Sequence, residues 1–293
     1  MTNLLFYLAV APPLFLMYLI YVFDKRGKDR REVSIVVFVL GCLTVIPSIA
    51  LESLMSYLQP IAVIGDSSLF PLINVRIFMM VLIQIALIEE FFKFLVVRRY
   101  AYFQDEFKAP YDGIIYAVIA SLGFALIENL MYVFNYGAEE PMLTAVKRMF
   151  SAIPAHGLMG VFMGYYIGKA KFDKINRDKL LIKGFVAAVI LHTLYDYFLF
   201  LPEPEGGMSL LTLVIAFFLA FNAIKESRNL VPANDPVKFR GTKKKGHMNY
   251  RSSSARASQR SKNVKNDGTC LACGADIMTT MRICHACGSR RRL

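Results

Sequence analysis

The stretch ALIEEFFKFLVV, residues 86–97, places Glu89, Glu90 and Lys93 inside a run of otherwise apolar side chains. A charged side chain near the centre of a bilayer costs at least ~2.5 kcal/mol on insertion scales, so each of the three needs a physical reason. Lys93 follows Glu89 by four residues and Glu90 by three, so on a helix its ammonium can reach either carboxylate. One glutamate can be neutralised in this way, and the other is left to accept a proton from water, as a general base does.

The composition places the whole chain in the membrane class. Of its 293 residues, 56% are hydrophobic and 13% are aromatic, whereas soluble chains are usually nearer half apolar. A helix that crosses about 30 Å of hydrocarbon needs about 20 mainly apolar residues. Seven stretches meet this requirement, so we expect an all-α polytopic membrane protein with about seven transmembrane helices. They are Leu4–Phe23, Val33–Leu58, Ile77–Val97, Asp112–Phe134, Met149–Gly168, Leu180–Leu201 and Met208–Ile224.

The charges of the loops predict how these helices are oriented. The first apolar stretch lacks a basic start and is followed by DKRGKDRRE, as in an uncleaved anchor whose N-terminus lies outside. Most lysines and arginines then fall in the loops that seven spans would place in the cytoplasm. We therefore expect a multi-pass protein of the plasma membrane, with its N-terminus outside and its C-terminus in the cytoplasm. The cytoplasmic loops carry Lys25, Arg26, Lys28, Arg30, Arg31, Arg98, Arg99, Lys108, Lys169, Lys171, Lys174, Arg177 and Lys179, and the outer loops carry Arg76, Lys147 and Arg148.

Residues 231–267 form a polar and basic segment that follows the last apolar stretch. Such a segment cannot bury enough apolar surface to order itself, so we expect a flexible linker. Together with the cytoplasmic loops it accounts for much of the net charge of +12. Anionic lipid is therefore the expected partner of these charges, and no nucleic-acid partner is expected.

Residues 268–293 carry two CxxC pairs, each followed by glycine. Four thiolates at this spacing can bind one zinc ion tetrahedrally, so we expect a small zinc ribbon with four cysteine ligands. Disulfides are the alternative, but a reducing cytoplasm argues against them. A ribbon of this size would be structural or would recruit a cytoplasmic protein partner, and by itself it names no activity. The expected zinc ligands are Cys270, Cys273, Cys284 and Cys287.

Three further apolar stretches also carry polar side chains. At about 1.5 Å of rise per residue, the acids and histidines lie roughly 10 to 18 Å below the outer ends of their helices, in one slab from the middle toward the outer face. Glu52, late in the second stretch, is expected near the outer surface, where water can solvate it. The other polar residues are Glu128 and Asn129 in the fourth stretch, His156 in the fifth, and His192 and Asp196 in the sixth.

Small residues at every fourth position predict which way these polar groups face. Such stripes mark the sides on which membrane helices pack closely. His156 continues a stripe of three glycines, and His192 and Asp196 continue a second stripe, so the polar groups are expected to point at neighbouring helices. The stripes are Gly160, Gly164 and Gly168 in the fifth stretch, Gly184 and Ala188 in the sixth, and Gly113, Ala117, Ser121, Ala125 and Asn129 in the fourth.

Each of these features alone has a structural explanation. An isolated Glu–Lys pair is more often a clasp between helices than a catalyst, and a single buried histidine is more often a packing residue. Proton-linked carriers also gather acids and histidines at mid-membrane, although no inverted repeat is evident in this sequence. The conjunction favours chemistry, because a general base would lie beside groups able to bind a metal or to stabilise an oxyanion.

Four motifs resemble those of the PrsW family of intramembrane proteases, within the superfamily that includes the CAAX prenyl endopeptidases. That family has an EExxK helix, an FxxxE helix, a lone intramembrane histidine and an HxxxD helix. In the same order, this chain has EEFFK at residues 89–93, FALIE at 124–128, AHGLMG around His156, and HTLYD at 192–196. The resemblance covers roughly residues 80–200 of a transmembrane domain that we expect over residues 1–230, and it leaves the linker and the ribbon outside.

The resemblance implies an intramembrane endopeptidase that cuts a membrane-anchored protein, as bacterial relatives cut anti-sigma factors from the extracytoplasmic side. Glu89 or Glu90 would activate the water, and His156 and His192 would orient it or hold the tetrahedral oxyanion. The family's name implies a catalytic metal, whereas the glutamate-rich set also suits a metal-free mechanism. A non-catalytic membrane scaffold or receptor with a zinc-ribbon adaptor is the alternative. The expected supporting residues are Lys93, Glu128, Asn129 and Asp196.

Overall fold

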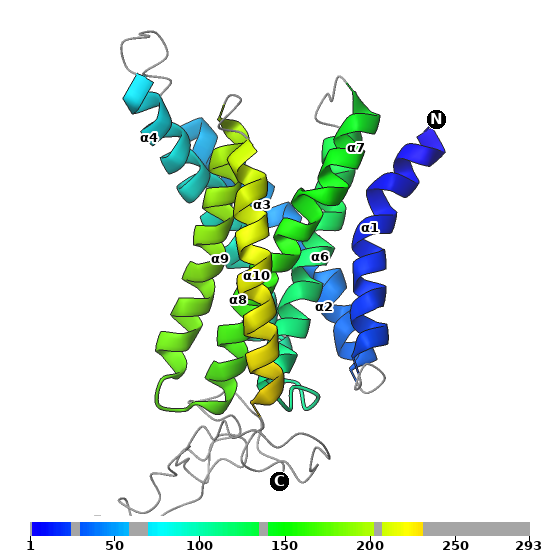
Figure 1. The fold of residues 1–293 in the computed structure, drawn as a ribbon, viewed down its shortest axis with the longest axis vertical. Helices are drawn as coiled ribbons and strands as arrows, with labels where there is room; N and C mark the ends of the chain where they lie inside the picture. The colour runs from blue at the N-terminus through cyan, green and yellow to red at the C-terminus, as the bar shows by residue number, and fades with distance from the viewer. Residues whose placement is uncertain (1, 25–29, 59–69, 135–139, 202–206, 231–293) are drawn as a thin grey trace, which may run out of the picture. The chain divides into compact units, whose positions relative to one another are not determined.

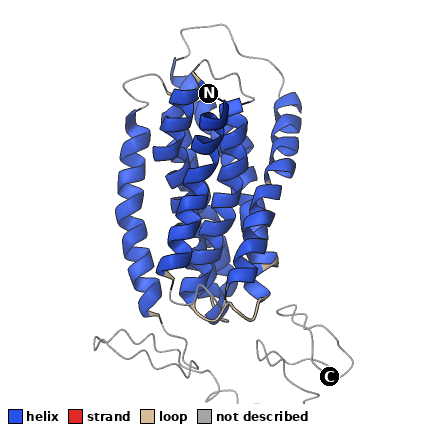
Figure 2. Ribbon diagram, turned by 90° about the vertical axis from the view of Figure 1, so that its right-hand side faces the viewer, coloured by secondary structure: helices blue, strands red, loops and turns tan. Residues whose placement is uncertain are grey.

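The computed structural model describes residues 2–24, 30–58, 70–134, 140–201 and 207–230, and all regular structure in these ranges is helical (Figures 1 and 2). This confirms the predicted all-α class for the part of the chain described. The predicted linker at 231–267 and the predicted ribbon at 268–293 lie outside the described residues. The main helices are α1 (Thr2–Phe23), α2 (Arg31–Leu43), α3 (Val45–Leu58), α4 (Phe70–Met80), α5 (Leu87–Arg99), α6 (Pro110–Phe134), α7 (Pro141–Phe150), α8 (Ala152–Phe172), α9 (Arg177–Phe200) and α10 (Met208–Asn229).

Helices occupy all seven predicted stretches, but two of these stretches are interrupted. The second, predicted as one helix, is divided into α2 and α3 at Thr44, whose hydroxyl donates to the carbonyl oxygen of Gly41 at 2.6 Å. In the third, a π-helical segment at Val81–Ala86 separates α4 from α5. Single π turns are often found at functional sites, and this one ends three residues before Glu89.

Five of the described helical segments are long and apolar enough to cross a membrane. The third and fifth predicted stretches are not among them. The third carries the charged residues of α5, and α8, which covers most of the fifth, carries His156, Lys169 and Lys171. The total of seven spans therefore stays a prediction. The five segments are Asn3–Phe23, Arg31–Tyr57, Pro110–Phe134, Arg177–Phe200 and Met208–Asn229.

Helix α6 is the centre of the unit formed by residues 1–229, since α8, α2, α1 and α5 all pack against it. All of its side chains from Gly113 to Ala125 are buried. The outer helices α1 and α10 instead expose large apolar side chains, such as Phe15 and Phe218. An exposed apolar surface of this kind is stable against lipid tails, which agrees with helices long enough to cross a bilayer.

The contact between α6 and α8 depends on glycines, as the small-residue stripes predicted. A Cβ atom added to Gly164 would overlap the carbonyl oxygen of Gly113, and one added to Gly113 would overlap that of Gly164. Gly160 and Gly168 also face the backbone of α6. The two helices therefore approach to backbone contact, and His156, one turn before Gly160, is brought against α6.

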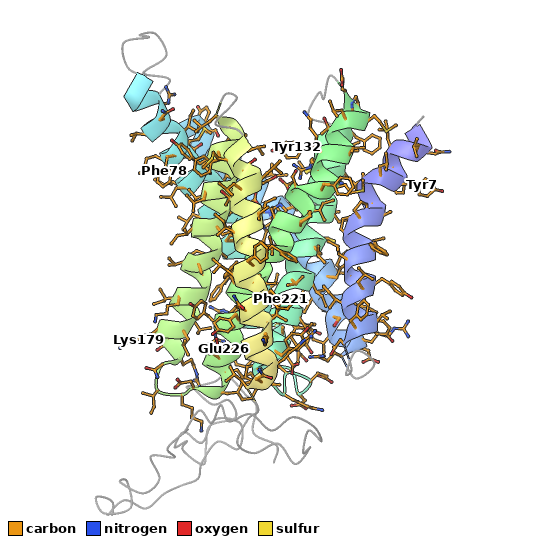
Figure 3. The ribbon with its side chains drawn as sticks, viewed as in Figure 1. Tyr7, Phe78, Tyr132, Lys179, Phe221 and Glu226 are labelled. Atoms are coloured by element: carbon orange, nitrogen blue, oxygen red, sulfur yellow. The ribbon has the colours of Figure 1, made fainter. Side chains whose placement is uncertain are left out.

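The turns at residues 100–109 and 173–176, which were predicted to be cytoplasmic, lie at one end of the helices, as do the end of α1 and the start of α2 (Figure 1). Lys179 and Glu226 mark this end in Figure 3, and Phe78 and Tyr132 lie toward the opposite end. At the end marked by Lys179 and Glu226, a buried ion pair between Arg30 and Asp112 ties the start of α2 to the start of α6. Asp112 also accepts the backbone N–H groups of the two residues 108 and 109, at 2.7 and 2.8 Å. The N-terminus of α6 is thus fixed by both a charge and a cap.

Replacing Gly164 by alanine should separate α6 from α8 and destabilise the protein. Because backbone would have to move, we expect a loss of about 1–3 kcal/mol, typical of overpacking a tight interior. Gly157→Ala is the matched control, since nothing lies within 4 Å of a Cβ added there. Thermal unfolding of both variants in the same detergent compares them. A Gly164→Ala variant as stable as Gly157→Ala would contradict the close contact.

Candidate active site

Glu89, Glu90 and Lys93 lie together on α5, inside the helix bundle. The ammonium of Lys93 donates to Glu89 Oε2 at 3.0 Å and to Glu90 Oε1 at 2.8 Å. The sequence predicted that Lys93 could reach either glutamate, and the structure has it contacting both. All three residues are buried, with Glu90 and Lys93 fully enclosed. The lysine charge is thus shared between two carboxylates, which leaves the group with an excess of negative charge.

His156, on α8, joins this group to α6. Lys93 Nζ also donates to His156 Nδ1 at 3.1 Å, and His156 Nε2 lies 2.7 Å from Glu128 Oε2. An ammonium has hydrogen-bond donors and no acceptor, so Nδ1 must carry a lone pair. The ring proton is then on Nε2, where it is donated to Glu128. Three helices are connected in this way through one imidazole ring.

His192, on α9, closes the group from the other side. Its Nδ1 lies 3.0 Å from Glu90 Oε1, and its Nε2 lies 3.1 Å from Asp196 Oδ2 and 3.9 Å from Glu89 Oε2. Both ring nitrogens therefore face carboxylate oxygens, and both can donate only when the ring is doubly protonated. The rings of His192 and His156 meet edge to face, with centroids 5.5 Å apart.

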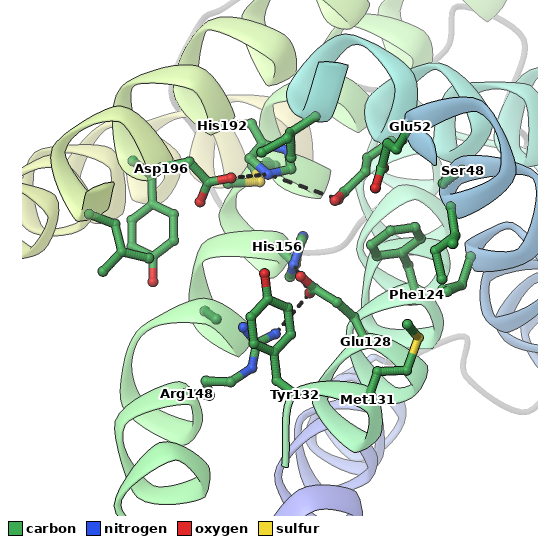
Figure 4. Close-up of a pocket in the computed structure, with 18 of the residues that line it drawn as sticks. Ser48, Glu52, Phe124, Glu128, Met131, Tyr132, Arg148, His156, His192 and Asp196 are labelled. Carbon is green, nitrogen blue, oxygen red and sulfur yellow. Dashed lines mark hydrogen bonds and ion pairs between the residues drawn. The ribbon is translucent and has the colours of Figure 1, made fainter. Parts of the chain in front are cut away.

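A pocket of about 130 Å³ lies between these side chains (Figure 4). Several water molecules fit in such a volume, since each needs roughly 10–15 Å³. Of the two adjacent glutamates, Glu89 lines the pocket, whereas Glu90 lies behind it with Lys93. Four predicted motifs on four helices thus meet at one cavity, as the sequence led us to expect. The motif residues that line it are Glu89, Phe124, Glu128, His156, His192 and Asp196.

Asn129, a predicted supporting residue, has a different place from the others. Its amide donates to the carbonyl oxygen of Ala9 on α1 at 2.8 Å, and its Oδ1 accepts from Arg148 Nε at 2.9 Å. The residue is fully buried but does not line the pocket. It therefore connects α1 to the wall of the site without facing the cavity.

Two residues of the pocket were misplaced by the sequence reasoning. Glu52 was expected in water near the outer surface, but it is half-buried and its carboxyl group faces the cavity in Figure 4. Arg148 was expected to be a loop charge, but it is bound to Glu128 at 2.9 Å, and its guanidinium lies 4.0 Å from the centre of the Tyr132 ring. The available signal was the amphipathic pattern of residues 141–150, which places Arg148 opposite an apolar face.

The charges of the site fit a bound cation. Five carboxyl groups around the pocket, from Glu52, Glu89, Glu90, Glu128 and Asp196, are matched among the described residues by Lys93, Arg148 and a doubly protonated His192, which leaves the carboxylates in excess. Glu89, Glu90 and His192 each offer one ligand atom within 4.8 Å of the others. Glu90 Oε2 is buried without a hydrogen-bond partner. Carboxylate oxygens and an imidazole nitrogen are ligands that zinc accepts, so these residues fit a divalent metal.

Comparisons with known proteins agree with this geometry. The model of a family described as PrsW family intramembrane metalloprotease matches residues 29–224. Protease PrsW of Oceanobacillus iheyensis is 36% identical over 230 residues, which cover 77% of this chain and 94% of that protein. Protease PrsW of Geobacillus kaustophilus is 31% identical over 231 residues, covering 78% and 95%. Protease PrsW of Bacillus subtilis is 30% identical over 192 residues, covering 65% and 80%.

No solved structure matches the chain. The family match nevertheless spans most of the described helices, and it contains all four motifs and every helix that lines the pocket. The extent of the match and the cluster of acids and histidines lead to the same conclusion: the chain is a multi-pass membrane protein of the PrsW family and an intramembrane protease.

Proposed function

We propose that this protease cuts a peptide bond of a membrane-anchored protein with a water molecule activated by Glu89. The observation that carries the proposal is the split between the two adjacent glutamates. Glu89 faces a cavity with room for water, while Glu90 is enclosed behind it and bound to Lys93 and His192. A general base must reach its water, and Glu89 has that access.

In the proposed reaction, Glu89 alone carries the transferred proton from the water to the leaving nitrogen. Glu89 removes a proton from water as the water oxygen attacks the carbonyl carbon of the scissile bond. When the carbon–nitrogen bond of the tetrahedral intermediate breaks, Glu89 returns the proton to the departing nitrogen. Glu90 and Lys93 make no contact with the substrate in this scheme. Their ion pair holds Glu89 in place, since Lys93 binds both carboxylates.

His192 provides the complementary charge. Both of its nitrogens face carboxylates, those of Glu90 and Asp196, so the doubly protonated ring is held at the wall of the pocket. We propose that the positive charge of this ring stabilises the oxyanion that develops on the carbonyl oxygen. Charges and dipoles fixed in advance at such a position, in a site shielded from bulk water, usually supply the largest single term in catalysis. We propose that His156, whose Nε2 proton is directed to Glu128, orients that carboxylate, which in turn holds the water in the pocket.

Glu89, Glu90 and His192 would hold a catalytic metal, if the protease uses one. Such a metal would polarise the scissile carbonyl and make water a better nucleophile at neutral pH. His192 would bind such a metal as the neutral ring, with one nitrogen deprotonated.

The depth and charge of the site support cleavage in the outer half of the bilayer. The basic turns gather at the end marked by Lys179, and the pocket residue Tyr132 lies toward the other end (Figure 3). We propose seven spans with the basic end in the cytoplasm, because lysine and arginine are enriched there. The N-terminus would then lie outside. The proposed substrate is a membrane-anchored regulator such as an anti-sigma factor, and this part rests on the family resemblance alone.

The cysteines outside the described residues carry a separate proposal. The two CxxC pairs at Cys270, Cys273, Cys284 and Cys287 are proposed to bind one structural zinc ion. The ribbon would then recruit a cytoplasmic protein, at the end of the linker of residues 231–267. Its metal is independent of the membrane site, so the two can be separated by mutation.

Replacing Glu89 by glutamine should remove proteolysis and leave the protein folded. Loss of a general base lowers the rate by about 100- to 10,000-fold. The measurement is cleavage of a panel of single-span reporter proteins in liposomes, with products identified by mass spectrometry. Glu226→Gln, on the exposed end of α10, is the matched control and should keep full activity.

Undiminished cleavage by Glu89→Gln would contradict the proposed base. A wild-type protein that cuts no reporter, combined with a large loss of thermal stability in Glu89→Gln, would instead favour a helix clasp in a non-catalytic scaffold.

Replacing all four ribbon cysteines by serine should release one zinc ion per chain and leave proteolysis intact. Metal analysis of the purified full-length proteins, together with the liposome assay, tests both parts. Zinc content equal to that of the wild type would exclude the ribbon. Metal that remains in the serine variant would belong to the membrane site. This remaining metal content should fall when His192 is also replaced by alanine.

A further inference from the structure

Arg148 lies on α7, the short helix that precedes α8. The exposed side of α7 is apolar, with Met142, Leu143, Val146 and Phe150 all accessible. The side chain of Arg148 instead turns inward and is only 12% exposed. A helix with one apolar and one charged face is typical of the membrane surface, but here one of its charges enters the pocket.

The guanidinium of Arg148 contacts three residues in the last two turns of α6. It donates through one terminal nitrogen to Glu128 Oε2 at 2.9 Å and through Nε to Asn129 Oδ1 at 2.9 Å. It also lies over the ring of Tyr132, 4.0 Å from the centroid (Figure 4). A planar group with donors in a fixed fork can hold two acceptors and stack on a ring at the same time, which an ammonium cannot do.

The oxygen that Arg148 binds is the one that receives the His156 proton. Glu128 Oε2 accepts from Arg148 at 2.9 Å and lies 2.7 Å from His156 Nε2. On the other side of the ring, Lys93 donates to His156 Nδ1. Lys93 therefore sets the neutral ring with its lone pair on Nδ1, and Glu128 accepts the proton that remains on Nε2.

We infer that Arg148 is a positioning residue of the protease. It holds Glu128 so that the Nε2 proton of His156 keeps its acceptor and the ring keeps its place between Lys93 and Glu128. The catalytic part of this inference rests on the proposed function, while the position of the ring does not. Without Arg148, the carboxylate of Glu128 loses its permanent countercharge and is free to turn, and the Nε2 proton of His156 then loses its acceptor.

The neighbouring residue Lys147 provides a matched control. It is a basic residue on the same helix, but its side chain is exposed on the outer side of α7, and no described residue forms an ion pair with it. Lys147→Ala therefore removes a positive charge from α7 without touching Glu128. Arg148→Lys is the conservative variant, which keeps the charge and loses the fork.

The first measurement is the cleavage kinetics of full-length variants on a single-span reporter in liposomes. Arg148→Ala should lower kcat by about 10- to 100-fold, as removing a partner of a catalytic histidine does, with KM little changed. Arg148→Lys should recover part of the loss, and added guanidinium ion should partly rescue Arg148→Ala but not Glu89→Gln. Wild-type kcat in Arg148→Ala, or an equal loss in Lys147→Ala, would overturn the inference.

The second measurement does not depend on activity. Nitrogen-15 NMR of the full chain labelled at histidine reports the tautomer, and the signals of His156 are identified by their absence in His156→Gln. The wild type and Lys147→Ala should show a neutral ring protonated at Nε2, and in Arg148→Ala the Nε2 resonance should shift because its proton has lost the acceptor Glu128. An unchanged His156 spectrum in Arg148→Ala would refute the positioning role. A wild type that cuts no reporter but shows the expected spectra would refute the proposed function and retain the role of Arg148.

Discussion

The ammonium of Lys93 is the interaction on which the rest of the site depends. It binds Glu89, Glu90 and His156 at 2.8 to 3.1 Å, from a position that is fully buried. Removing one partner from a buried ion pair typically costs about 3–5 kcal/mol, because the other charge is left unpaired. Two adjacent carboxylates can persist inside a bundle of apolar helices because this cation is shared between them. The glutamate that faces the cavity is therefore available for chemistry without unfolding the helix that carries it.

Sequence reasoning found the motif residues because their spacing follows the helix. Lys93 is one turn from Glu89, and Asp196 is one turn from His192, so these pairs are local and can be read from the chain. The contact between α6 and α8 was also predictable, since glycines at every fourth position indicate close packing. The contribution of Arg148 was not, because Arg148 meets Glu128 on another helix, 20 residues earlier in the chain. Glu52 was misplaced for a similar reason, since its depth depends on how α3 leans toward the cavity.

The boundaries of the predicted spans show where hydropathy fails as a guide. Hydropathy gives no sign of the break at Thr44, where the Thr44 hydroxyl bonds the carbonyl oxygen of Gly41 and Pro47 has no N–H to donate to the turn before it. The composition of residues 81–86 likewise does not indicate the π turn before α5. It shifts the register of the helix by one residue, and so changes which side chains of α4 and α5 share a face. Hydropathy therefore located the helices, while the local backbone chemistry decided how each one is divided and turned.

The size of the pocket limits the shape of the chain that can be cut. An α-helix with its side chains is about 10–12 Å across, far wider than a cavity of about 130 Å³ can admit. A scissile carbonyl can reach Glu89 only from extended backbone. Under the proposed function, a membrane-spanning substrate would therefore unwind locally before hydrolysis, giving up intrahelical hydrogen bonds in a solvent that offers no replacement. Helices weakened by glycine or proline would give up the least, so the energetics of unwinding would help to select the bond.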